Sequence, residues 1–151
     1  MSENINRSPQ DDNQQVSTGR RLAREVVIQL LYEDDLNPSR MAEDPQEYVR
    51  KRLHHEPVGL AEFALQLILG VRQNRDQLDA IILESAENWT IARMAPTDRN
   101  TIRLGAYEIT QSETPGEVVI HEAVELAKRF GTKDSGGFVN GVLDKILHAH
   151  A

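Results

Sequence analysis

Apolar residues recur at three- and four-residue steps along most of this chain, which is the period of amphipathic helices. The pattern is clearest in residues 114–147. A first inward stripe there comprises Val119, Ala123, Leu126, Ala127 and Phe130. A Thr-x-x-Glu capping box, from Thr114 to Glu117, surrounds Pro115 at the expected helix start, and a stop signal follows at Gly131. We therefore expect a helix with Thr114 as its N-cap.

The segment after this helix contains Val139-Asn140-Gly141-Val142, which is in isolation compatible with a type I′ hairpin. The apolar spacing favours a helix, because Phe138, Val142 and Ile146 are four residues apart. Gly141 then lies inside a helix, where glycine costs about 1 kcal/mol relative to alanine. That cost indicates a close approach of another backbone at Gly141, unless the glycine reflects sequence drift alone.

The same period predicts five helices before residue 114. They start near Thr18, Asp44, Pro57, Asp76 and Thr97 or Asp98. The third is the most apolar, so we expect it to be the central core helix, with the fourth packed crosswise on it. Seven helical segments with short connections predict an all-α fold. Residues 1–17 are polar and are expected to form a disordered tail.

Composition narrows the classes of function. The 151 residues suit one compact domain, and the absence of cysteine excludes disulfides, thiol catalysis and cysteine-ligated zinc. The sequence shows neither an apolar run near the ~20 residues of a membrane span nor a signal peptide, so we expect a cytoplasmic protein. A net charge of −7 argues against indiscriminate nucleic-acid binding. Any nucleic-acid site must therefore be a confined basic patch.

Three arginines form the best candidate for such a patch. Arg20, Arg21 and Arg24 lie close to the start of the expected first helix and share one face through their spacing. Cations there oppose the helix dipole at a cost of ~0.3–1 kcal/mol each. This cost favours a role in binding an anion, and a solvated surface is the alternative.

Candidate catalytic chemistry is scarce. The sequence contains no Gly-rich phosphate loop, no Ser-centred elbow and no His-x-x-x-His spacing. His54 and His55 are adjacent, so their side chains point ~100° apart on a helix and are poorly placed to share one metal ion. His121-Glu122 is interpreted as a helix surface rather than an acid–base pair. We expect no catalysis, no cofactor and no metal site.

Three segments together resemble the NusB family of transcription antitermination factors. The C-terminal segment contains HEAVELAK (121–128), Phe130-Gly131, Asp134-Ser135 and FVNGVLDK (138–145). The other two contain RRLARE (20–25) with QLLY (29–32), and RLGAYEI (103–109). The resemblance covers most of the chain after about residue 18, whereas residues 37–55 match in helical pattern only.

The resemblance implies two small helical bundles, at residues 18–75 and 76–151, and a surface for boxA RNA. The implied RNA-binding residues are Arg20, Arg21, Arg24, Lys128, Lys133, Asp134 and Ser135. Arginine and lysine would contact phosphate, whereas Asp134 would either accept a hydrogen bond from base or sugar or cap the last helix. The implied contacts to the small-subunit ribosomal protein NusE are Tyr32, Asp98 and Arg99. As alternatives, Asp98 caps a helix and Tyr32 is an aromatic at the core edge.

The function implied by the resemblance is that of a non-catalytic, RNA-binding antitermination factor. It would recognise boxA together with NusE in an antitermination complex of RNA polymerase, binding RNA weakly alone and strongly with its partner. Two other classes are compatible with the residues: a recognition domain related to that of rRNA cytosine methyltransferases, and a helical protein-interaction module without RNA binding. Both a monomer and a homodimer are compatible with the sequence.

Overall fold

The chain is helical through most of residues 9–150, the range that the computed structural model describes, with side chains described from residue 19 onward. Its α-helices are α1 (Pro9–Leu36), α2 (Gln46–Leu53), α3 (Val58–Gln73), α4 (Arg75–Ser85), α5 (Pro96–Gln111), α6 (Gly116–Phe130) and α7 (Ser135–Ala149). Two short 3₁₀ helices, η2 (Pro38–Ala42) and η3 (Ile91–Arg93), lie in the connections. The described range contains no strand, so the all-α prediction is confirmed and the hairpin alternative is wrong.

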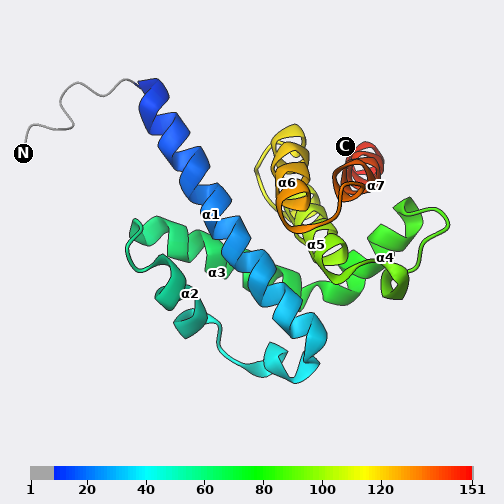
Figure 1. Cartoon of the computed structure of the whole chain (residues 1–151), viewed down its shortest axis with the longest axis horizontal. Coiled ribbons are helices and arrows are strands. Elements are labelled where there is room, and N and C mark those ends of the chain that lie inside the picture. The colour runs from blue at the N-terminus through cyan, green and yellow to red at the C-terminus, as the bar shows by residue number, and fades with distance from the viewer. Residues whose placement is uncertain (1–8, 151) are drawn as a thin grey trace, which may run out of the picture.

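The helices form two groups that meet at α5 (Figure 1). In one group α1 packs against α3, and α2 packs against both. In the other group α6 and α7 pack on each other and on α5, and α4 packs against α5 and α7. Because α5 also contacts α1 and α3, it is the helix that both groups share.

This arrangement corrects the expected centre of the core. The most apolar helix, α3, is not central, and α4 contacts α5 and α7 more extensively than α3. Helix α5 is buried on all sides, although its buried residues include Asn100, Arg103 and Glu108. Ranking helices by apolarity failed here because the buried charged residues of α5 are satisfied by ion pairs. In a composition these residues count only as polar, so α5 did not rank as the central helix.

The inward stripes themselves were predicted correctly. Val119, Ala123 and Leu126 on α6 are buried, as are Val142 and Ile146 on α7. All of these except Val119 belong, with the buried faces of α1 and α3, to one hydrophobic cluster that extends through both groups. Helical periodicity therefore identified which side of these elements faces the core.

Three expected helix starts differ from the structure. Helix α1 begins at Pro9, which lacks the N–H that a first helical residue does not need, so residues 9–17 are helical and not part of a disordered tail. The expected tail at residues 1–8 lies outside the described range. Helix α6 begins after Pro115 and α5 after Ala95, in each case without a side-chain cap hydrogen bond. The predicted caps at Thr114 and at Thr97 or Asp98 are therefore wrong.

The expected close approach occurs at a different glycine. Nothing lies within 4 Å of a Cβ placed on Gly141, which faces outward on α7. A Cβ on Gly105 of α5 would lie 2.6 Å from Cδ1 of the buried Leu143, so α7 approaches α5 closely there. The glycine needed for packing is thus in α5, the shared helix.

Among the described helices none combines the length and the apolarity that a membrane span requires.

Candidate nucleic-acid interface

The three arginines of α1 differ in exposure and in their ion-pair partners. Arg20 is exposed, and its guanidinium carbon lies 4.8 Å from the centre of the Phe63 ring on α3. Arg21 retains 41% side-chain exposure and donates to Glu122 on α6 over 2.8 and 3.1 Å. Arg20 and Arg21 can therefore reach solvent from the same turn of α1.

Arg24 differs from the other two because it is buried. It donates two hydrogen bonds, of 3.0 and 2.8 Å, to the carboxylate of Glu108 on α5, and the two side chains are 4% and 2% exposed. All of its surroundings are protein, so the structure does not support Arg24 as an RNA contact. The dipole argument for the arginines is also wrong, because α1 begins at Pro9 and Arg20 lies well inside the helix.

The Arg21–Glu122 pair lies at the contact between α1 and α6. Burial alone would raise the pKa of Glu122, but the hydrogen bond and charge of Arg21 outweigh it, so this pKa lies below its ordinary value. The same hydrogen bond raises the pKa of Arg21. The interpretation of Glu122 as a helix surface residue is wrong, since it is 5% exposed, whereas His121 is exposed as expected.

The loop between α6 and α7 presents a second set of predicted residues. Lys128, Lys133 and Asp134 are exposed. Ser135 is 1% exposed, and its Oγ accepts a hydrogen bond from the N–H of Thr132 over 2.9 Å. Ser135 therefore stabilises the loop from its buried side. Asp134 occupies the N-cap position of α7 but makes no side-chain cap hydrogen bond, so the capping alternative for this residue is wrong.

An ion pair ties this loop region to α1. Arg129, in the last turn of α6, donates to Glu25 over 2.7 Å, and Glu25 follows Arg21 by one helical turn. The exposed end of α6 and the arginines of α1 thus belong to adjoining elements, as Figure 1 shows for the two helices. The last turn of α6, which precedes the loop that carries Lys133, therefore contacts α1 one helical turn from Arg21.

The residues expected to contact a protein partner lie in two different surroundings. Tyr32 is half-buried and lines a pocket of about 530 Å³ together with Leu36, Thr97 and Phe130. Asp98 follows Thr97 in the first turn of α5, and its Oδ1 is buried without a hydrogen-bond partner. Asp98 is therefore the sequence neighbour of Thr97, the residue that α5 contributes to this pocket.

Arg99 lies in a cluster of ion pairs. Its side chain is 16% exposed, forms an ion pair with Asp35 and donates to the carbonyl of Met94 over 3.1 Å. Arg75 and Arg103 are also within ion-pair distance of Asp35, at 3.2 and 3.7 Å. Arg99 therefore belongs to a cluster at the junction of α1, α4 and α5, and the structure does not support it as a partner contact.

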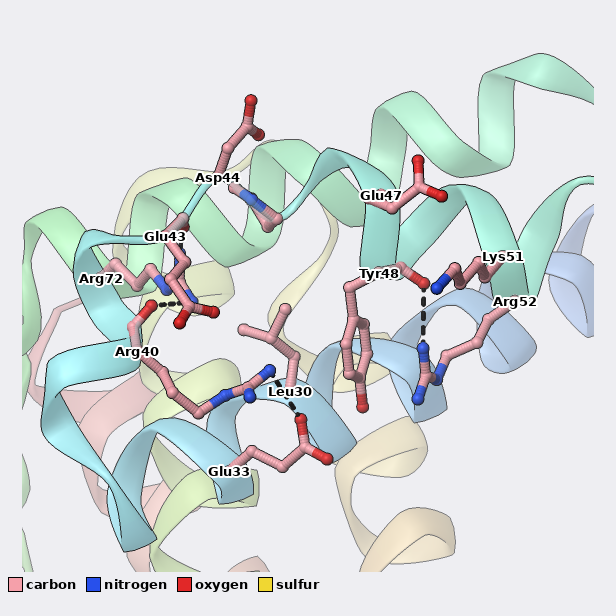
Figure 2. A pocket seen from close by; sticks show the side chains of 11 residues that line it. Leu30, Glu33, Arg40, Glu43, Asp44, Glu47, Tyr48, Lys51, Arg52 and Arg72 are labelled. Carbon is pink, nitrogen blue, oxygen red and sulfur yellow. Dashed lines mark hydrogen bonds and ion pairs between the residues drawn. The ribbon is translucent and has the colours of Figure 1, made fainter.

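A second pocket, of about 380 Å³, lies between α1, η2 and α2 (Figure 2). It adjoins the pocket beside Tyr32, because Glu33, Tyr48 and Arg52 line both. Its charged lining residues are Glu33, Glu43, Asp44, Glu47, Arg40, Lys51, Arg52 and Arg72. Since the acidic and basic groups balance, this pocket offers no net attraction for phosphate. The described residues also contain no cluster of three potential metal ligands.

Sequence reasoning missed the acidic partners of the arginines. Glu108 lies three residues after Gly105 and four after Leu104, which are both buried on α5. A glutamate at an inward position of a helix requires a buried cation, because an unpaired buried carboxylate is too costly. That rule, applied to Glu108 and Glu122, is the signal that could have found both ion pairs.

Comparisons with known proteins agree with the fold. The NusB family model matches residues 21–148. Transcription antitermination protein NusB of Bdellovibrio bacteriovorus is 37% identical over 135 residues, which cover 88% of this chain and 98% of that protein. The protein of the same name from Desulfotalea psychrophila is 41% identical over 133 residues, or 84% and 94% of the two chains.

Two solved structures show the same fold. T. maritima NusB has a TM-score of 0.79 and 36% identity, covering 87% of this chain and 92% of that chain. A NusB chain in the crystal structure of antitermination factors NusB and NusE in complex with dsRNA has a TM-score of 0.73 and 29% identity, covering 87% and 98%. From its sequence and its fold, the chain belongs to the NusB family.

Proposed function

We propose that this protein is a non-catalytic transcription antitermination factor that binds boxA RNA together with ribosomal protein NusE. The observation that carries the proposal is the contact between α1, which carries the exposed Arg20 and Arg21, and the last turn of α6, from which the α6–α7 loop leaves, in a chain of net charge −7. The names of its relatives, and the related complex of NusB and NusE with dsRNA, support the same reading. As a transcription factor in an RNA polymerase complex, it acts in the bacterial cytoplasm.

In this proposal Arg20, Arg21, Lys128 and Lys133 contact phosphate, because their charged ends reach solvent. Asp134 repels phosphate when ionised, so it accepts a hydrogen bond from a base or a sugar hydroxyl. Arg24 and Ser135 are buried and contact no RNA in this proposal. Arg24 holds α1 against α5 through Glu108, and Ser135 stabilises the α6–α7 loop through its hydrogen bond with Thr132.

NusE contacts the neighbourhood of Tyr32 in this proposal. The pocket beside Tyr32 offers apolar area, with Leu36 62% exposed at its edge. Asp98 follows the pocket residue Thr97, and the negative charge of its carboxylate suits a basic ribosomal protein, although its Oδ1 atom is itself buried. Arg99 contributes by holding the first turn of α5 against Asp35.

Binding of RNA by the protein alone is weak, and NusE makes it strong. An acidic chain with a small basic patch has little long-range attraction for phosphate, and a basic partner beside the patch extends the positive surface. By linkage, RNA tightens the protein–protein association by the same factor. Titrating labelled boxA RNA with the protein, with NusE and with their mixture at one salt concentration tests this. Affinity in the mixture no higher than that of independent sites would exclude cooperation.

The first prediction concerns the RNA surface. Replacing Arg20 and Lys133 with glutamate should weaken boxA binding by the protein–NusE pair by at least tenfold and flatten its dependence on salt, since two phosphate contacts are lost. Fluorescence anisotropy of labelled RNA at several salt concentrations measures both. Both residues are exposed, so the variant should keep its helix content.

The matched control is Lys51→Glu, which makes a similar charge reversal at an exposed position on α2. It should leave RNA affinity within about twofold and the salt slope unchanged, because α2 carries none of the proposed contacts. Equal affinities for wild type and the Arg20/Lys133 variant would remove this surface. Complete absence of RNA binding by the wild-type pair would instead support a protein-interaction module.

The second prediction concerns the partner surface. Asp98→Lys should weaken association with NusE by about tenfold or more, because it replaces an acceptor by a cation facing a basic protein. Isothermal titration calorimetry without RNA measures this, and circular dichroism confirms the helix content. The control Glu62→Lys makes the same charge change on an exposed part of α3 and should retain the wild-type affinity. Undiminished affinity of Asp98→Lys would rule out Asp98 as a contact.

A further inference from the structure

An exposed aromatic side chain lies beside the first turns of α7. Trp89 is 42% exposed and is the only tryptophan of the chain. Its ring centre is 5.3 Å from that of Phe138 on α7, with the two planes tilted by 56°. The chain reverses just before it, at Asn88, which has a positive φ of 66°. This turn holds an indole at the surface, where burial does not require one.

The position of Trp89 is continuous with the α6–α7 loop. The N–H of Phe138 donates to the carbonyl of Asp134, so the two residues lie one turn apart on the same face of α7. Beyond Phe138 the face stays open, because a Cβ on Gly137 or Gly141 would meet nothing within 4 Å. At these two glycines, therefore, no other element covers the surface of α7 near Asp134 and Phe138.

Positive charge accompanies the ring. The guanidinium carbon of Arg93 lies 5.3 Å from the ring centre of Trp89. Arg93 is exposed, and the hydrogen bond that it donates to the Asn88 carbonyl is long, at 3.5 Å. Lys145 of α7 approaches Glu87, which precedes Asn88, at 3.6 Å. An aromatic face with a movable arginine is the combination that binds single-stranded nucleic acid through stacking and phosphate contact.

We propose that Trp89 stacks on an unpaired base of the RNA that passes the α6–α7 loop, and that Arg93 moves from the ring face to the adjoining phosphate. This inference rests on the proposed function and adds a residue outside the arginine-rich and loop segments. Stacking is available to any base, so Trp89 contributes affinity and fixes the path of the strand without selecting a sequence. The exchange of Arg93 for a base keeps the ring face covered in both states.

The single tryptophan gives a direct test. Adding short single-stranded boxA RNA to the full-length protein with NusE that lacks tryptophan should quench and shift the Trp89 fluorescence, with the same midpoint as anisotropy of labelled RNA. Trp89→Leu keeps an apolar contact with Phe138 but loses the stacking face, and should weaken RNA binding about tenfold. Trp89→Phe keeps a ring and should stay within about threefold of wild type. Arg93→Gln should lower the salt slope by about one.

Two comparisons separate the possible failures. Leu69→Ala changes an equally exposed apolar residue on α3 and should leave RNA affinity unchanged. If RNA binds by anisotropy while Trp89 fluorescence does not change and Trp89→Leu binds as wild type, the inference is overturned and the proposed function stands. If the wild-type pair binds no RNA, the proposed function fails and the inference fails with it. The fluorescence of the wild-type protein tests the contact even if Trp89→Leu does not fold.

Discussion

Arg24→Ala should lower the free energy of unfolding by about 3–5 kcal/mol, although Arg24 stands in a motif that predicts RNA binding. The substitution leaves the carboxylate of Glu108 buried, 2% exposed, without its two hydrogen bonds. It also leaves space between α1 and α5 where the guanidinium packs 5.1 Å from the centre of the Phe63 ring. Equilibrium unfolding in urea should show a midpoint lower by at least ~1 M.

A double variant distinguishes the buried charge from lost packing. Arg24→Met combined with Glu108→Leu replaces both ions by apolar groups of similar size, and should recover most of the stability lost in Arg24→Ala. Arg50→Ala removes an arginine whose ion pair with Glu47 is exposed, and should leave the urea midpoint unchanged. A small loss of stability in Arg24→Ala, equal to that in Arg50→Ala, would contradict a structural role for Arg24.

The second large effect is expected at Asp35, where α1, α4 and α5 meet. Its carboxylate pairs with Arg75, Arg99 and Arg103 and accepts a hydrogen bond from Asn100 over 3.1 Å. Asp35→Asn removes the charge while keeping the size, and leaves three guanidinium groups facing one another. We expect a loss of about 3 kcal/mol or more at neutral pH, measured by urea unfolding.

The same carboxylate makes stability depend on pH in a defined direction. Burial would raise the pKa of Asp35, but Arg99, Asn100 and Arg103 together hold it below its ordinary value. Below about pH 4 the unfolded chain therefore binds a proton more readily than the folded protein does, so protonation favours unfolding. The contribution of Asp35 should be fully present above about pH 4 and disappear as pH falls through its lowered pKa.

Urea midpoints of wild type and Asp35→Asn between about pH 2.5 and 7 measure this dependence. The difference between the two proteins should be constant above about pH 4 and shrink below it. Glu122, whose pKa is also lowered, contributes to the acid loss in both proteins and cancels in the comparison. A difference that stays constant down to the lowest pH would show that Asp35 gains nothing from ionisation.

Periodicity was sufficient to predict the helices and their buried faces, because burying an apolar stripe is the main force that orders an amphipathic helix. It could not identify the central helix. In α5 the residues Arg103 and Glu108 are as buried as Ile102, and only their ion pairs on other elements make this tolerable. Such partners are distant in sequence, so a local pattern does not contain them.

The candidate site shows the same limit at single residues. Spacing located the arginines on one segment of α1, yet Arg24 points to α5 and Arg21 to α6. Neighbouring helical residues point ~100° apart, so Arg99 pairs with Asp35 while Asp98 points elsewhere and leaves its buried Oδ1 without a hydrogen-bond partner. Some residues of a motif therefore reach solvent, and others pack inside and position the exposed ones. Which residue does which depends on the packing of the whole molecule.

The place of α5 in the chain has a consequence for synthesis on the ribosome. Helix α1 leaves the ribosome first, but α5, which covers it, ends roughly 75 residues later, a delay of roughly 4–15 s at bacterial elongation rates. During that time Arg24 has no Glu108 to pair with and stays hydrated beside the apolar stripe of α1. A cation beside that stripe opposes aggregation of the nascent helix. Arg24 is buried only when α5 supplies Glu108, which is when the fold is completed.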